Sequence, residues 1–172
     1  MKILKYIGVT ILLVVFPALS WYYLDTGLEY RKEAHEAMLP KEDLNELISA
    51  RRFTTEFDLR ATCDGMTTIL ISRKDDKKDA TIKKLYDQFD DAFNFQMVLL
   101  NGSGLTPMAE FEKDNFHVVP AQLNYDNEIV LLDNQMRVRT NHTFEKESVQ
   151  KLVSYTALLL PRTKGRDIKQ RK

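Results

Sequence analysis

A run of nineteen residues near the N-terminus, residues 6–24, contains no charged side chain. As a helix rising about 1.5 Å per residue it would span roughly 28 Å, close to the thickness of a bilayer's hydrocarbon core. Lys2 and Lys5 precede the run, and three aromatic residues, 21–23, close its far end. Basic residues on one side and an aromatic belt on the other are typical of a transmembrane helix. We therefore predict a single-pass anchor over residues 1–24.

The orientation of this anchor follows from the same residues. With the lysines inside, the remainder of the chain faces the periplasm or the equivalent compartment of the inner (plasma) membrane. Arg31 and Lys32 follow soon after the run, so the inverted topology, with a cytoplasmic domain, stays open.

A cleaved signal peptide is the competing interpretation. Residues 6–16 have the length of its apolar region, Pro17 would end the helix, and residues 18–20, Ala-Leu-Ser, resemble a small-x-small cleavage site. The apolar run nevertheless continues past that site, beginning with the bulky Trp21. This continuation favours the anchor.

The rest of the chain has the length and composition of one folded domain. Of its 172 residues, 44% are hydrophobic and 29% are charged, which suits a single core of about 110 to 130 residues with extra segments at the ends. The formal net charge is zero, but residues 162–172 form a basic tail in which Asp167 is the one acidic residue. The remainder is therefore net acidic, and we expect no nucleic-acid partner.

Cys63 is the single cysteine of the chain. An intramolecular disulfide and thiol-disulfide exchange within the chain are therefore excluded. We predict that Cys63 is buried and inert, as most free cysteines are.

Residues 25–50 read as a juxtamembrane helical stalk, in which helix formers are interrupted by Pro40 before a short second helix. Residues 53–59 then alternate apolar with polar side chains, and an Asp-Gly pair separates them from residues 66–73. This pattern predicts two strands around a turn.

A strand-helix-strand unit follows. Asp79 is a suitable N-cap for a helix with an apolar stripe, and residues 95–100 read as a buried strand. The strands at residues 66–73 and 95–100 should be parallel, joined through this helix by a right-handed crossover. The stripe consists of Ile82, Leu85, Tyr86 and Phe89. A loop at residues 101–104 and a short helix over residues 107–115 are predicted next.

The last part of the chain predicts a hairpin and a helix. Residues 128–132 and 136–140 are apolar or alternating segments on either side of an Asp-Asn-Gln turn. Thr143 can cap the final helix, which Pro161 ends. The order βαβ followed by ββα predicts an α/β fold.

Three segments resemble the Sco/SenC family, membrane-anchored thioredoxin-like proteins that deliver copper to cytochrome c oxidase. They are LDTGLEYRKEA (residues 24–34), TTILISRKDDKKDATIKKLYDQF (67–89) and IVLLDNQMRVRTNHTFEKESVQKLVSYTALLLP (129–161). The resemblance implies a thioredoxin-like domain over residues 51–161, with a central mixed sheet flanked by helices, and a role near the oxidase.

The family's chemistry is not carried over with the resemblance. Its Cys-x-x-x-Cys motif falls on Lys74 and Lys78, and its distal copper-binding histidine falls near Tyr125 or Asp126. Copper(I) requires soft sulfur or imidazole ligands, and a protonated ammonium has no lone pair to donate. We therefore predict no catalytic residue, no metal and no cofactor. Pro120 is a candidate for the family's cis-proline.

The other potential ligands are scattered. His35, His117 and His142 show no metal-binding spacing, and the methionines lie mostly in apolar runs, where they fill cores. These methionines are Met38, Met66, Met97, Met108 and Met136.

The charged loop before the predicted helix is a possible partner-docking site or simply a solvated loop. Its members are Arg73, Lys74, Asp75, Asp76, Lys77 and Lys78.

These patterns favour a non-enzymatic, membrane-tethered thioredoxin-like module that binds or scaffolds a protein partner. The resemblance suggests a respiratory cytochrome oxidase complex or its assembly machinery as that partner. The alternative is a copper-binding or redox protein whose site was rebuilt from Cys63 with histidine or methionine ligands.

Overall fold

The computed structural model describes residues 11–105, 114–125 and 127–161 of the chain. It divides into two units, Met1–Leu39 and Pro40–Lys172.

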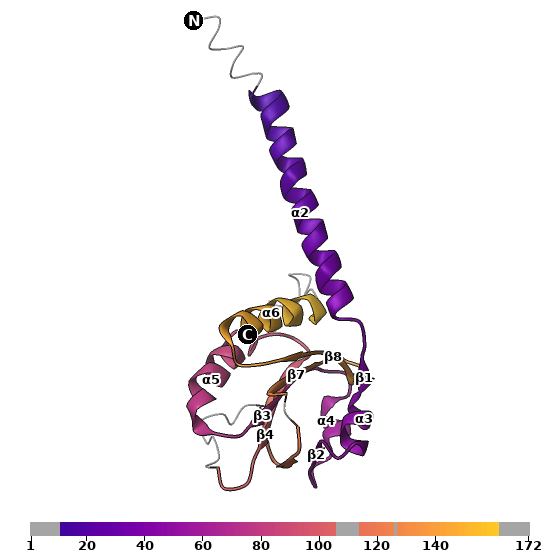
Figure 1. Ribbon diagram of the computed structural model, residues 1–172, viewed down its shortest axis with the longest axis vertical. Coiled ribbons are helices and arrows are strands. Elements are labelled where there is room, and N and C mark those ends of the chain that lie inside the picture. The colour runs from indigo at the N-terminus through magenta and orange to yellow at the C-terminus, as the bar shows by residue number, and fades with distance from the viewer. Residues whose placement is uncertain (1–10, 106–113, 126, 162–172) are drawn as a thin grey trace, which may run out of the picture. The chain divides into compact units, whose positions relative to one another are not determined.

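The first unit is helical. A π-helix, η1 (Ile11–Val15), leads into helix α2 (Phe16–Ala37) (Figure 1). Pro17 lies in the first turn of α2, directly after η1. Because α2 extends to Ala37, the predicted helix before Pro40 is confirmed.

Within the described ranges, we find no helix with both the length and the apolarity needed to cross a bilayer. Residues 6–10 of the uncharged run lie outside those ranges.

The second unit contains a six-stranded mixed sheet with the order β1-β8-β7-β3-β4-β5. Strand β3 is parallel to β4, β4 is parallel to β5, and β7 is antiparallel to both β3 and β8. The predicted parallel pair and the predicted hairpin are confirmed. The strands are β1 (Glu42–Asp43), β3 (Thr67–Arg73), β4 (Phe95–Asn101), β5 (Phe116–Pro120), β7 (Ile129–Leu132) and β8 (Arg137–His142).

Helices cover both faces of this sheet (Figure 1). Because successive side chains of a strand point to opposite faces, Ile69 and Ile71 pack with one pair of helices, and Leu70 packs on the other side with a second pair. The first pair is α5 (Asp79–Asp87) and α6 (Lys146–Leu159), and the second is α3 (Leu44–Ser49) and α4 (Leu59–Cys63). The predicted α/β class is confirmed.

The predicted apolar stripe is confirmed, since all four of its residues are buried in the core under α5. The final helix ends at Leu159, two residues before Pro161, and buries Leu152 and Thr156.

The first predicted hairpin is wrong. Its second segment, residues 66–73, is confirmed as strand β3. Within residues 53–59, only β2 (Phe53–Thr54) is a strand, and it pairs with β6 (Gln122–Leu123) in a separate two-stranded sheet rather than with β3. Residues Leu59–Cys63 form α4, because the Asp58 carboxylate accepts hydrogen bonds from the backbone N–H groups of Arg60 and Ala61. Such a cap stabilises a helix start, and here it outweighs the alternating pattern.

Both predicted helix caps are also wrong. Lys78 occupies the N-cap of α5, while Asp79 is the first helical residue and turns its carboxylate to Arg73. Glu145 occupies the N-cap of α6, and Thr143 Oγ1 accepts from its N–H at 3.4 Å. In each case tertiary or turn contacts engage the side chain that the local pattern assigned to a cap.

Pro120 is not a cis-proline, since the described residues contain no cis peptide bond. It is the last residue of β5, opposite Asn101 of β4. Most of the predicted helix over residues 107–115 lies outside the described residues, and residues 114–115 form a turn.

Candidate functional site

Strands β3, β4 and β5 run in parallel and end at the same edge of the sheet, at Arg73, Asn101 and Pro120. Ligand sites of open α/β sheets lie beyond the carboxyl ends of the strands. The charged loop, residues 73–78, begins at this edge and leads through the short 3₁₀ helix η2 (Asp76–Lys78) into α5. In this fold, a ligand or partner site is therefore expected at this loop.

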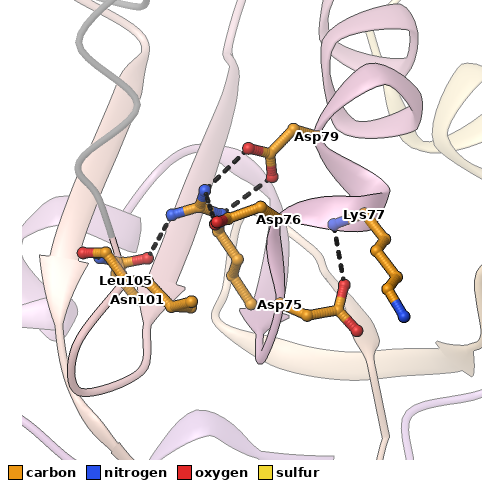
Figure 2. Close-up of polar contacts among 7 residues, drawn as sticks. Asp75, Asp76, Lys77, Asp79, Asn101 and Leu105 are labelled. Atoms are coloured by element: carbon orange, nitrogen blue, oxygen red, sulfur yellow. Dashed lines mark hydrogen bonds and ion pairs between the residues drawn. The ribbon is translucent and has the colours of Figure 1, made fainter.

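Arg73 is the centre of this edge. Its Nε donates to Asp79 Oδ1 at 2.9 Å and its Nη2 to Asp79 Oδ2 at 2.7 Å, a bidentate pair. Nη2 also donates to Asp76 Oδ1 at 2.6 Å, and Nη1 donates to Asn101 Oδ1 at 2.8 Å. Figure 2 shows these carboxylate and amide groups converging from the loop, α5 and β4. Charge-assisted bidentate bonds of this kind are among the strongest in proteins.

The Arg73 side chain is only 2% exposed, so the prediction that it lies on an exposed docking loop is wrong. The hydrogen bonds to Asp79 raise the pKa of Arg73, and burial opposes them. A buried cation is tolerated because its donors are paired. Arg73 joins β3, β4 and the start of α5.

Asp75 has a local role. Its Oδ1 accepts from the backbone N–H of Lys77 at 3.1 Å and so caps η2 (Figure 2). Lys74, Asp76 and Lys77 are the exposed members of the loop. The surface that the loop can offer to a partner is therefore smaller than its sequence predicts.

Lys78, one of the two positions matched to the family's cysteines, contacts other residues of the same domain. Its ammonium forms an ion pair with Glu128 and lies 4.7 Å from the ring centroid of Phe144. Glu128 Oε2 also accepts from the Phe144 N–H at 2.9 Å. Lys78 thus ties the loop to the segments that begin β7 and α6.

The electrostatics of Glu128 agree with this arrangement. Burial raises its pKa, but the hydrogen bonds from Lys78 and from the Phe144 N–H outweigh burial, and the net pKa is lowered. Lys74, the other matched position, contributes to the same lowering through its charge. Both lysines therefore act on one structural carboxylate.

A cavity of about 10 Å³ lies among Lys74, Lys78, Glu128 and Phe144. This volume is about that of a single water probe. The cavity does not accommodate an organic substrate in this conformation.

Tyr125, the described residue nearest the family's distal histidine, also has structural partners. It is buried. Its hydroxyl accepts a hydrogen bond from Asn127 Nδ2 at 2.8 Å and lies 3.2 Å from Asn141 Oδ1. The Arg52 guanidinium lies 5.6 Å from its ring centroid. Asp126 lies outside the described residues.

Cys63 is buried at the end of α4, which confirms the prediction. Burial raises the pKa of its thiol to about 11, and a hydrogen bond with Thr68 only partly opposes burial. The thiolate is the nucleophile and the metal ligand. Cys63 is therefore held in its unreactive form at neutral pH.

The three histidines lie in α2, β5 and β8. His142 is buried, with Nδ1 3.2 Å from Ser148 Oγ and Nε2 2.8 Å from Thr140 Oγ1. Burial lowers its pKa to about 4, and burial also lowers the pKa of His117. Over the part of the chain that the structure describes, no three His, Cys, Asp or Glu side chains are grouped to hold a metal ion.

Two of the methionines, Met38 and Met97, are buried, and Met66 and Met136 are partly buried. Met97 and Met136 pack in the core as predicted. Met108 lies outside the described residues.

A second surface was not predicted from the sequence. A groove of about 700 Å³ runs between α5 and α6. The predicted stripe of α5 identified Leu85 as a residue facing the sheet, but the sequence does not tell which helix lies beside α5. The groove is lined by Thr81, Lys84, Leu85, Gln88, Phe144, Lys146, Val149, Gln150, Val153 and Ser154.

No protein-family model matches the chain, and no curated protein or solved structure matches it.

Proposed function

We propose that the protein is a non-catalytic, membrane-tethered thioredoxin-like module that binds or scaffolds a protein partner. One observation carries the proposal. At the loop where the resembling family holds its reactive thiols, Lys78 is committed to Glu128 and Phe144, and Arg73 to Asp76, Asp79 and Asn101. These residues stabilise the fold, so the function is assigned to the surface of the domain.

The order of the strands supports the thioredoxin-like assignment and the Sco/SenC resemblance. The unit β3-α5-β4 is followed, after β5 and β6, by β7-β8-α6, and the four strands β4-β3-β7-β8 are neighbours in that order. Helices α5 and α6 pack on the same apolar cluster. This is the order of elements that the residue patterns predict, and a mixed sheet flanked by helices is what the resemblance implies.

The exposed side chains of the first unit support the anchor. Each residue of a helix advances by about 100°, so the exposed apolar residues of the first part of α2 project on all sides. A helix that is apolar all round requires cover, and a bilayer supplies it. These residues are Phe16, Leu19, Trp21, Tyr22, Tyr23 and Leu24.

The partner that we propose is a respiratory cytochrome oxidase complex or its assembly machinery, by resemblance to the Sco/SenC family. The domain then faces the periplasm or the equivalent compartment, where the soluble part of that family acts.

Affinity purification of the full-length protein from native membranes in mild detergent tests the proposal. Mass spectrometry identifies the co-purifying proteins, and metal analysis is made on the protein after it has been separated from them. The matched control carries residues 1–39 fused to an unrelated soluble domain, so that partners held by the helix alone are recognised.

We expect respiratory subunits with the full-length protein and not with the control, at substoichiometric copper. A protein that extracts alone contradicts partner binding, and stoichiometric copper contradicts the non-catalytic assignment.

The alternative is a copper or redox site built around Cys63. The buried thiol with its raised pKa disfavours it. Copper(I) titration of the full-length protein and of Cys63→Ser decides between them. Binding that Cys63→Ser abolishes would establish the alternative, and equal or absent binding in both removes it.

A further inference from the structure

The groove between α5 and α6 has an apolar floor. Leu85 of α5 and Val149 and Val153 of α6 line it, together with Phe144, which precedes α6. Phe144, Val149 and Val153 are only partly buried by the rest of the domain. The groove therefore keeps apolar surface in contact with water, which is typical of interaction sites.

The rims of the groove carry positive charge. Lys84 on α5 and Lys146 on α6 are both exposed, and the remaining polar lining residues are uncharged. None of the lining residues is acidic; the uncharged members are Thr81, Gln88, Gln150 and Ser154. Although the described chain is rich in carboxylates, they do not line this groove.

The dimensions of the groove suit a helix. The lining residues of α5 extend over residues 81–88 and those of α6 over residues 146–154, which corresponds to about 10 to 12 Å of each helix. An amphipathic helix lays apolar side chains spaced three and four residues apart into such grooves. The two lysines then select carboxylates on the flanks of the incoming helix.

We infer that this groove docks an amphipathic helix of the partner protein, one whose apolar stripe is flanked by acidic side chains. The inference rests on the proposed partner-binding function and names the surface and the chemistry of the contact. Lys84 and Lys146 provide charge complementarity at the rims, and Leu85, Val149 and Val153 receive the apolar side chains.

The test uses the full-length protein in phosphatidylcholine nanodiscs, whose lipid is uncharged overall. The probe is a synthetic helical peptide of about 15 residues, with leucines spaced three and four apart and glutamates on both flanks. Its twin carries lysines in place of the glutamates. Gln150→Cys provides a site for an environment-sensitive maleimide dye, because the native Cys63 is buried with a thiol pKa of about 11.

We expect the glutamate peptide to shift the dye emission to the blue and to bind more tightly than its lysine twin. Reversing both rim charges, Lys84→Glu with Lys146→Glu, should weaken the glutamate peptide by about tenfold and strengthen the twin. The control, Lys151→Glu, reverses one charge on α6 outside the groove and should alter binding by less than about twofold. Binding to empty nanodiscs is subtracted.

The inference is overturned if the two peptides bind equally, if neither binds, or if the double reversal changes binding no more than Lys151→Glu. Its failure is distinguishable from failure of the proposed function. A natural partner that co-purifies equally with the double-reversal variant refutes the groove and leaves partner binding intact, whereas a full-length protein without any partner contradicts the function itself.

Discussion

Asp79→Ala is the sharpest test of the polar cluster around Arg73. The substitution removes both bonds of the bidentate pair from a guanidinium that is only 2% exposed, while its bonds to Asp76 and Asn101 remain. Each charge-assisted hydrogen bond contributes about 1.5 to 3 kcal/mol, and breaking a buried ion pair typically costs about 3 to 5 kcal/mol. Asp76 remains and Asp79 is partly exposed, so we expect a loss of about 3 kcal/mol.

For a domain of this size, that loss corresponds to a decrease of about 10 °C in Tm. The assay is thermal unfolding of the full chain in detergent, followed by near-ultraviolet circular dichroism of the tyrosines in the second unit. Asp76→Ala is the matched control, because Asp76 is 62% exposed and makes one of the bonds. It should cost about 1 kcal/mol or less.

A double-mutant cycle separates the pair from its surroundings. When Arg73→Met is combined with Asp79→Ala, the buried charge that has lost its bidentate partner is removed as well, and the double variant should be less destabilised than the sum of the two single variants by about 2 kcal/mol. Additive effects, or equal losses for Asp79→Ala and Asp76→Ala, would refute the view that Arg73 depends on the Asp79 carboxylate.

Three further predictions concern single side chains. The pKa of His142 is lowered from 6.5 to about 4 in the folded state, so the unfolded chain binds more protons between these values and stability should fall as the pH decreases from 6.5 to 4. Urea unfolding across this range should show the slope, and His142→Leu should reduce it, leaving the part that His117 and Glu128 contribute through their own lowered pKa values. With a thiol pKa of about 11, only about one part in a thousand of Cys63 should be thiolate at pH 8. Cys63 should therefore react with Ellman's reagent only after denaturation, and rapid reaction of the native protein would contradict its burial. Lys78→Ala removes the ion pair and the cation–π contact, and should lower the free energy of unfolding, measured by chemical denaturation, by about 1 to 2 kcal/mol. The control Lys77→Ala, on the exposed side of the loop, should change it by less than about 0.5 kcal/mol.

The sequence predicted the elements in which side-chain periodicity and burial agree. The continuous apolar strand at residues 95–100 and the stripe of Ile82, Leu85, Tyr86 and Phe89 both follow from the need to cover a sheet on two faces. Parallel pairing of β3 and β4 followed because a helix connects them. An apolar strand and an apolar helix stripe both repeat along the chain, and few arrangements of helices and strands other than a covered sheet bury both.

Predictions that depended on a single polar side chain were wrong. Asp79, Thr143 and Asp58 are all residue types that cap helices, yet of these three only Asp58 caps the helix that follows it. Which polar group a carboxylate or hydroxyl meets depends on how neighbouring elements are placed in space: Asp79 meets the guanidinium of Arg73 because the end of β3 lies beside the start of α5. Local pattern carries no information about that competition.

The sequence by itself determined the α/β class, the stripe of α5 and the final hairpin, because hydrophobic burial repeats with the period of the backbone. The burial of Cys63 followed instead from the apolar character of free cysteines. Tertiary structure alone decided that Arg73 lies inside the domain, that Lys78 joins Glu128 and Phe144, and that α5 and α6 form a groove with lysines on both rims. The physical reason is that a charged group is buried only where its partners converge. Arg73 meets Asn101 of β4 and Asp79 of α5, and Lys78 meets Glu128 and Phe144, which precede β7 and α6.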